Sequence, residues 1–254
     1  MPSYEPVTAL LRGLKVLEAI AETGAATIKS LHAATGIPKA TLVRMLETLI
    51  HAGYVYSAGE QPRYALTARA LSIAAGFDQG QHLLSVVGPM LSEFQKSLGW
   101  PSDLGVFDRD AMVIVGTSRQ PGVLSVNRKV GSRVPAVKTA LGRACLAFLP
   151  DAQRLAALHE LRALTKEPKD IKRFEAELAA VRARGYAMSN QENLPSIRAL
   201  AAPIFDMSGV VASLNIIIVA EAMSIDELQE KYAETLLSIT EKMSATLRKA
   251  PIQK

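Results

Sequence analysis

The feature that most constrains this chain is a run of three short helical patterns with little sequence between them. Apolar residues recur every three to four positions over 7–22, 28–35 and 38–52. Thr27 is a suitable N-cap for the second helix and Gly36 a suitable C-cap, so a tight turn is expected between the second and third helices. Two helices joined in this way form a helix-turn-helix unit.

A predicted β-hairpin follows the three helices. Residues 54–56 and 63–66 have the composition of strands, and the residues between them are polar and typical of a turn. A short helix capped by Thr67 is expected to run to about residue 76. Three helices and a hairpin in this order predict a winged helix-turn-helix, a DNA-binding domain, over residues 1–76.

A helical linker is predicted at 77–99, and it contains a long helical pattern over 83–98. After this linker the sequence changes to short strand patterns separated by helices. The region 100–254 is expected to be an α+β domain, an antiparallel sheet with helices grouped around it. Its expected strands are 103–107, 112–117, 123–126, 197–205 and 210–219, and its expected helices are 139–149, 152–163, 172–184 and 225–247. Ser224 and Glu227 have the spacing of a capping box for the last helix.

Composition excludes several classes of protein. Hydrophobic residues make up 49% of the chain, charged residues 21%, and the mean hydropathy is +0.16, which is ordinary for a globular protein. The longest strongly apolar run, 210–220, is too short to cross a bilayer, and the first residues lack the pattern of a secretory signal. A single cysteine, Cys145, fits a reducing compartment. We therefore expect a cytoplasmic protein with no membrane partner.

The charge is unevenly distributed along the chain. The net charge is +1 over residues 1–80, +4 over 81–150 and zero over 151–254. No acidic residue occurs between 111 and 150, where a basic stretch runs from Arg128 to Arg143. This stretch is either a solvated surface or a region that attracts an anionic small molecule or nucleic acid.

Nothing in the sequence predicts catalysis, a metal site or a cofactor. The four histidines have neither the spacing of metal ligands nor that of a catalytic triad, and the chain lacks a nucleophile elbow, a Walker motif and a dinucleotide fingerprint. Cys145 lies in a small, apolar helical pattern, which favours a buried structural residue over a nucleophile. The protein is therefore not expected to be an enzyme.

Several runs resemble the IclR family of bacterial transcriptional regulators. RGLKVLEAIA at 12–21, ATGIPKATLVRMLETLIHAGYV at 34–55 and YALT at 64–67 are similar to its DNA-binding half. The second half is similar to its effector-binding domain, which has a GAF/PAS-like fold, in VGSRVPAVKTALGRACLAFLP at 130–150, RGYAMSNQEN at 184–193 and IRALAAPIFDMSGVVASLNI at 197–216. The resemblance covers almost the whole chain in the right order. Within the family, the runs at 100–115, 137–142 and 213–232 are most similar to MhpR-type regulators of hydroxyphenylpropionate catabolism.

The candidate DNA-binding residues lie on the third helix and beside the hairpin turn. Lys39, Thr41 and Arg44 fall near one face at the start of the third helix, the part of a recognition helix that enters the major groove. Arg44 is the best candidate for reading a base, whereas Lys39 and Thr41 suit phosphates. Arg63 could reach a phosphate or the minor groove, or could be an ordinary strand cation. Because the net charge over residues 1–80 is only +1, affinity would need a dimer and well-placed charges.

The candidate effector-binding residues come from several parts of the second domain. The resemblance implies that an effector touches the loop and helix start at Lys138, Thr139, Ala140 and Leu141, then Ser189, Glu192, Ala199, Asn215 and Ile217. The helix that starts near Thr139, with Lys138 beside it, is also a natural carboxylate site. Trp100 and Asp103 open the first strand, where an aromatic wall and an acceptor would suit a phenolic ring, although Trp100 could simply pack in the core.

These observations predict a ligand-responsive regulator that binds a double-stranded DNA operator. The expected effector is a small, aromatic monocarboxylate. The basic stretch from Arg128 to Arg143 and the helix start near Thr139 suit an anionic head. Ala199 and Ile217, where the family often has Cys and Ser, make the expected site less polar and suit an apolar body. The resemblance also implies homodimers through the N-terminal helices and tetramers through the effector domains. The alternatives are an enzyme domain fused to a helix-turn-helix dimerisation module, and a DNA-binding protein that needs no ligand.

Overall fold

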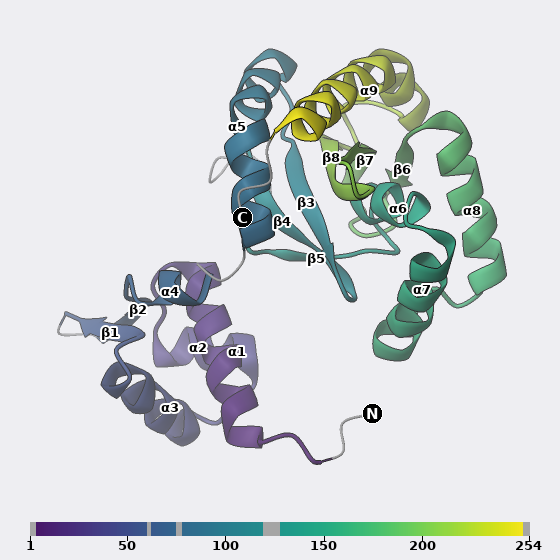
Figure 1. Cartoon of the computed structure of the whole chain (residues 1–254). Helices are drawn as coiled ribbons and strands as arrows, with labels where there is room; N and C mark the ends of the chain where they lie inside the picture. The colour runs from purple at the N-terminus through teal and green to yellow at the C-terminus, as the bar shows by residue number, and fades with distance from the viewer. Residues whose placement is uncertain (1–3, 60–61, 75–77, 119–127, 251–254) are drawn as a thin grey trace. The chain divides into compact units, whose positions relative to one another are not determined.

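The structure, a computed structural model, describes residues 4–59, 62–74, 78–118 and 128–250 (Figure 1). The chain divides into two compact units, residues 1–78 and 79–254. The first unit contains α1 (Thr8–Thr23), α2 (Ile28–Thr35), α3 (Lys39–His51), β1 (Val55–Ala58), β2 (Arg63–Leu66) and α4 (Ala70–Ala74). The predicted winged helix-turn-helix is therefore confirmed.

The first unit is built around a small core between α1, α2 and α3. Val16, Ile20, Leu31, Leu42 and Leu46 are buried in this core. The backbone N–H of Ser30 donates to the Thr27 hydroxyl, and the Thr27 N–H donates to the Ser30 hydroxyl, which completes a capping box at the start of α2.

One face of α1 is not covered by this core. Leu10, Leu11 and Leu14 are exposed, as is Val7 just before the helix begins. The spacing of these residues places them along one stripe of the helix.

The second unit contains a six-stranded antiparallel sheet with the strand order β5-β4-β3-β8-β7-β6. Its strands are β3 (Asp103–Asp108), β4 (Ala111–Thr117), β5 (Arg133–Pro135), β6 (Ala187–Asn190), β7 (Ile197–Phe205) and β8 (Val210–Val219). Its helices are α5 (Asp78–Leu98), α6 (Ala140–Ala147), α7 (Asp151–Thr165), α8 (Ile171–Arg184) and α9 (Ile225–Lys249). This is the predicted α+β architecture.

The sheet separates two apolar cores. On one face the sheet packs against α5 and α9, and on the other against α6, α7 and α8 (Figure 1). Leu83, Val87 and Leu91 of α5 belong to the first of these cores, so the helix expected as a linker also contributes to the interior of the second unit. None of the helices in the described part of the chain is long and apolar enough to cross a membrane.

The structure differs from the predicted elements in a few places. It contains β5 and β6, which were not predicted, because β5 has only three residues and the Ala-Met-Ser-Asn sequence of β6 has weak strand propensity. Helix α5 starts at Asp78 instead of residue 83. The strand expected at 123–126 lies outside the described residues.

Candidate DNA-binding surface and effector cavity

Helix α3 presents the predicted DNA-binding side chains to solvent. Lys39 and Arg44 are exposed and Thr41 is half-buried, while Leu42 and Leu46 on the opposite face are buried in the core. Among the described residues, neither Lys39 nor Arg44 has an ion-pair partner. An exposed helix start with two such cations has the charge and shape to approach the phosphate backbone of DNA and the edges of its bases.

The turn before α3 is held by side chains that sequence reasoning did not single out. The Thr35 hydroxyl donates to Leu31 O at 2.6 Å and accepts from the Ile37 N–H at 3.2 Å. His32 Nδ1 lies 2.8 Å from Ile37 O, and Lys15 Nζ of α1 donates to Thr35 O at 2.9 Å. These bonds fix the turn between α2 and α3 and connect it to α1, so they orient the helix that carries Lys39 and Arg44.

The hairpin is joined to the helices through its second strand. Arg63 is exposed at the first position of β2, opposite Ala58 and next to the turn. Tyr64 pairs with Ala26, just before α2, through two backbone hydrogen bonds of 2.8 and 2.9 Å. Arg63 therefore lies on a strand anchored to the helix-turn-helix, next to the hairpin turn.

In the second unit, residues from four elements surround a small cavity at the start of α6. Its volume is about 20 Å³, enough for about one water molecule. Seven predicted effector residues line it: Thr139, Ala140, Leu141, Ser189, Ala199, Asn215 and Ile217. Arg128, Asn193, Leu194 and Ile197 also line it. We call it the effector cavity.

Strand register explains why distant residues meet at this cavity. Ser189 of β6 is directly opposite Ala199 of β7, and Ala199 is opposite Ile217 of β8. Directly opposed residues in an antiparallel sheet have their side chains on the same face. The three therefore form a row across the sheet, and Asn215 lies two residues before Ile217 on the same face of β8.

Hydrogen bonds hold the loop before α6 against this row. The Thr139 hydroxyl accepts from the Gly142 N–H at 3.2 Å and donates to Pro135 O at 2.7 Å, which caps α6. The Ser189 hydroxyl donates to Lys138 O at 3.2 Å. The polar side of the cavity is thus a cluster of hydroxyl and amide groups at the N-terminus of a helix.

Arg143 and Glu192 form an ion pair beside the cavity. Arg143 Nε donates to Val137 O at 2.9 Å, and its Nη1 donates to Met188 O at 3.1 Å and to the Glu192 carboxylate at 3.0 Å. Glu192, which is predicted to touch the effector, joins the loop after β6 to α6 through Arg143. Its side chain is outside the cavity lining, where it helps to position the loop.

Three other predicted effector residues also lie outside the lining. Trp100 packs against the core on the opposite face of the sheet, with α5 and α9. Asp103 is fully buried, accepts a hydrogen bond of 2.6 Å from the Thr117 hydroxyl, and donates from its backbone N–H to Asn215 Oδ1 at 2.6 Å. Lys138 turns away from the cavity and lines a different one.

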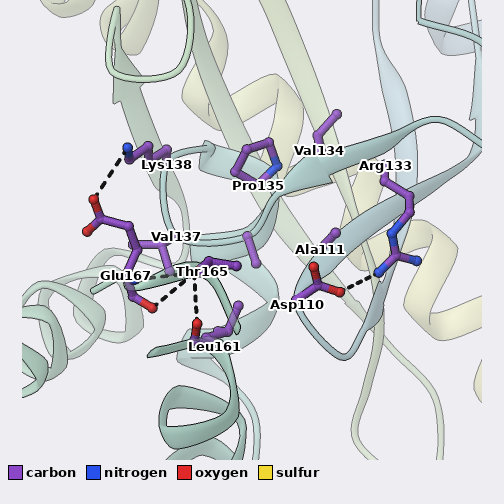
Figure 2. A pocket seen from close by; sticks show the side chains of 11 residues that line it. Asp110, Ala111, Arg133, Val134, Pro135, Val137, Lys138, Leu161, Thr165 and Glu167 are labelled. Carbon is purple, nitrogen blue, oxygen red and sulfur yellow. Dashed lines mark hydrogen bonds and ion pairs between the residues drawn. The ribbon is translucent and has the colours of Figure 1, made fainter. Parts of the chain in front are cut away.

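That second cavity lies between β4, β5 and α7 and has a volume of about 310 Å³ (Figure 2). Its floor is apolar, and its rim carries two ion pairs. Lys138 Nζ points to Glu167, 3.4 Å from Oε1, and Arg133 Nη2 is 2.6 Å from Asp110 Oδ1. Each cation on this rim therefore faces a carboxylate.

Arg128 is a lining residue that sequence reasoning did not assign to the site. Its side chain is 12% exposed, and its Nη1 lies 4.0 Å from Asp103 Oδ2. The basic stretch from Arg128 to Arg143 was a signal for such a residue. That signal could not distinguish Arg128 from Lys138, because it does not reveal which cation faces the cavity.

Cys145, the one cysteine of the chain, is not suited to act as a nucleophile. Cys145 is buried in α6, and burial raises the pKa of its thiol to about 12, so the thiol stays protonated at neutral pH. No cluster of potential metal ligands occurs among the residues that the structure describes. The prediction of a buried Cys145 is confirmed.

Two family descriptions match the chain. The family of the bacterial transcriptional regulator IclR C-terminal domain matches residues 77–245, and the IclR helix-turn-helix domain matches residues 9–59. The transcriptional repressor IclR of Escherichia coli K12 is 31% identical over 214 residues, which cover 81% of this chain and 77% of that protein.

Solved structures of similar proteins agree over nearly the full length. A structure of a transcriptional regulator from Rhodococcus sp. RHA1 has a TM-score of 0.71 and 28% identity, and the match covers 96% of this chain and 99% of that one. An IclR homologue from Microbacterium hydrocarbonoxydans, solved with 4-hydroxybenzoate, has a TM-score of 0.70 over 95% of this chain and 98% of that one. It is only 18% identical, so this likeness shows the fold alone.

Proposed function

The chain belongs to the IclR family of bacterial transcriptional regulators, and from this premise we propose that a small carboxylate controls its binding to an operator. The family assignment makes it a DNA-binding regulator and not an enzyme, since the relatives are transcriptional regulators. The identity of the operator and of the effector belongs to the proposal, as does action in the cytoplasm, where bacterial DNA is found.

The DNA-binding part of the proposal rests on the exposed start of α3. Lys39, Thr41 and Arg44 are its contact residues, and Arg63 on the hairpin adds a phosphate or minor-groove contact. Selection of bound duplexes from a random library, followed by competition with random DNA, tests this. A specific site should bind roughly 1,000-fold tighter or more than random DNA at physiological salt.

The observation that carries the effector proposal is the convergence of distant residues on one cavity. Its polar groups at the start of α6 suit an acid, and Ala199 and Ile217 suit an apolar body. We therefore propose a small aromatic monocarboxylate. The ligand of the Microbacterium homologue, 4-hydroxybenzoate, is the natural first probe. The finer assignment to hydroxyphenylpropionate catabolism rests on sequence runs alone and stays a prediction.

The size of the cavity adds a mechanism to this proposal. Small-molecule sites measure about 300–1,000 Å³, whereas this cavity holds about 20 Å³. An aromatic acid can bind only if the walls separate, so it must favour a state more open than this one. A ligand with different affinities for two states shifts the population between them, which is how effector binding would reach the DNA-binding unit.

Thermal-shift screening of the full-length protein against small carboxylates tests the effector proposal. A ligand that binds only the folded state raises the melting temperature by mass action. If no carboxylate changes either the melting temperature or operator binding, the alternative is favoured: a DNA-binding protein that needs no ligand.

The position of the acid group is a further part of this proposal. The acid is expected at Lys138 and the Thr139 helix start, and Thr139 lines the cavity. The Lys138 amine is directed to Glu167 instead. Replacing Lys138 by Met tests that assignment, which stays a prediction.

We also propose a homodimer formed through α1. The exposed stripe of Val7, Leu10, Leu11 and Leu14 supports it, because an uncovered apolar face on a short helix is typical of an interface. Two-fold symmetry would match paired half-sites on DNA. Light scattering at micromolar concentration, with and without operator DNA, measures the dimer and any tetramer formed through the effector domains. A monomer under both conditions would eliminate this part of the proposal.

A further inference from the structure

The outward face of α3 carries an aliphatic side chain among its charged ones. Four exposed residues have the i, i+3, i+4, i+7 spacing that places side chains on one face of a helix: Ala40, Val43, Arg44 and Glu47. The buried residues of α3 lie on the opposite face, in the core of the first unit. Val43 therefore lies on the face that the proposed function directs to DNA.

Neither the core nor helix propensity favours valine at this position. Val43 is 37% exposed and, among the described residues, it is not part of the apolar cluster that α1, α2 and α3 form. Branching at Cβ also makes valine a weaker helix former than alanine or leucine. Val43 thus adds little to the stability of α3, and its methyl groups are available for contact with a partner.

The major groove of DNA offers an apolar partner for such a side chain. Thymine carries a methyl group at C5 on this edge, and small aliphatic side chains recognise it by direct contact. Val43 and Arg44 are one residue apart, a rise of about 1.5 Å along α3, and base pairs are stacked about 3.4 Å apart. The two side chains can therefore reach neighbouring base pairs at the same time.

From this geometry we infer that Val43 reads the methyl group of a thymine next to the base that Arg44 contacts. The inference rests on the proposed DNA-binding function and adds to it a residue that determines specificity. Arg44 selects a base by hydrogen bonds, whereas Val43 selects one by apolar contact alone. The two contacts can therefore be separated by changing the DNA instead of the protein.

Deoxyuridine in place of thymidine tests the inference, because it forms the same base pair without the methyl group. A duplex selected from a random library by the full-length protein is the probe, and each dT on both strands is replaced by dU in turn. At one position in each half-site, the replacement should weaken binding of the wild-type protein about fourfold, as expected for the burial of one methyl group. Gel-shift titrations at constant salt measure the dissociation constants.

Val43→Ala should remove this sensitivity to the thymine methyl group. Its affinities for the dT and dU duplexes should differ by less than about 1.5-fold at that position, which is the coupling that a double-mutant cycle detects. Ile50→Ala is the matched control, since Ile50 is also β-branched, 39% exposed and on α3. It lies seven residues later, about 10 Å further along the helix, so this variant should keep the fourfold difference.

The outcomes separate this inference from the proposed function. If Val43→Ala keeps the difference between dT and dU, or if Ile50→Ala loses it, the inference is overturned. It is also overturned if no dU replacement weakens wild-type binding while Arg44→Ala still weakens binding to the same duplex, in which case the proposed function stands. If no duplex is selected over random DNA, the proposed DNA-binding function fails, and this inference fails with it.

Folding of the variants is checked by their melting temperatures without DNA. Alanine is a stronger helix former than valine or isoleucine, and both replaced side chains are exposed, so both variants should fold. Comparison of two duplexes on the same variant also cancels any change in the fraction of folded protein. The ratio of the two dissociation constants therefore reports the methyl contact alone.

Discussion

The two units of this protein build their functional sites in opposite ways. In the first unit, the candidate DNA-contacting residues are exposed cations carried by one helix and one hairpin strand. In the second, the candidate effector residues are mostly buried and come from α6, β6, β7 and β8. A substitution in the first site should therefore change binding without changing folding, whereas one in the second should often change both.

The largest loss of stability is expected from a substitution at Gly142, inside the second unit. A Cβ at this position would lie 2.1 Å from Ala136 O, in the backbone of the loop that begins the effector cavity. Gly142→Ala should therefore cost about 3 kcal/mol or more and lower the melting temperature of the second unit by roughly 10 °C. Differential scanning calorimetry should show the transition of the first unit unchanged.

Gly13→Ala in α1 is the matched control for that substitution. No atom lies within 4 Å of the added carbon at Gly13, so alanine should stabilise the helix by about 0.5–1 kcal/mol. The same substitution, Gly to Ala, should thus stabilise the first unit and destabilise the second. A melting temperature that is unchanged by Gly142→Ala would mean that the loop moves freely away from α6.

Arg44→Ala should affect function alone. Loss of a base contact should cost about 1–3 kcal/mol on the specific operator and much less on random DNA. Lys39→Ala is the comparison, since loss of a phosphate contact should weaken binding to both and reduce the slope of affinity against salt by about 0.9. Gel-shift titrations at several salt concentrations measure both effects. Equal losses on operator and random DNA for Arg44→Ala would rule out its role as a base reader.

The same contrast explains how much the sequence could predict. Lys39 and Arg44 could be found because helical periodicity alone assigns residues to the buried or exposed face of α3. The effector cavity depends on the pairing of β6, β7 and β8, and periodicity contains no information on which strands pair. Only the family resemblance indicated Ser189, Ala199 and Ile217 together, and the strand that carries Ser189 was not predicted at all.

Side-chain direction was the second limit of sequence reasoning. Lys138 precedes the cap of α6, so proximity in sequence favoured it as the partner of an acid. In the structure, its backbone carbonyl faces Ser189 while its amine faces Glu167 in the other cavity. Arg128 lies ten positions earlier and reaches the effector cavity through the fold. Tertiary packing, which no local pattern encodes, determines which of the two side chains lines the effector cavity.

A smaller loss of stability, of similar size in both units, is expected from removing the N-cap hydroxyls of the capping boxes of α2 and α9. Thr27→Ala in the first unit and Ser224→Ala in the second each remove a hydroxyl that accepts a backbone N–H, at 3.1 and 3.2 Å. Each should cost about 1 kcal/mol. Because a smaller domain has a smaller unfolding entropy, the shift should be about 4–8 °C in the first unit and about 2–4 °C in the second. Equal shifts would imply that the two units unfold as one.

The smallest expected effect is a pH dependence that only the second capping box has. Hydrogen bonds from the Ser224 hydroxyl and N–H lower the pKa of Glu227 from its usual 4.5, whereas the box at Thr27 uses the neutral Ser30. A carboxylate with a lowered pKa in the folded state stabilises that state above the unfolded pKa, and this stabilisation is lost as the pH falls through the folded pKa.

Between about pH 5 and pH 3, the wild-type second unit should therefore lose slightly more stability than the Glu227→Gln variant. Gln still fits the capping position but cannot be protonated in this range, so it separates the charge of Glu227 from its geometry. Calorimetry at stepped pH values measures the difference between the two proteins, and the first unit provides the internal reference. A wild-type second unit that instead gained stability relative to the Glu227→Gln variant as the pH fell would have the wrong sign. It would mean that the bonds to Ser224 do not favour the ionised carboxylate.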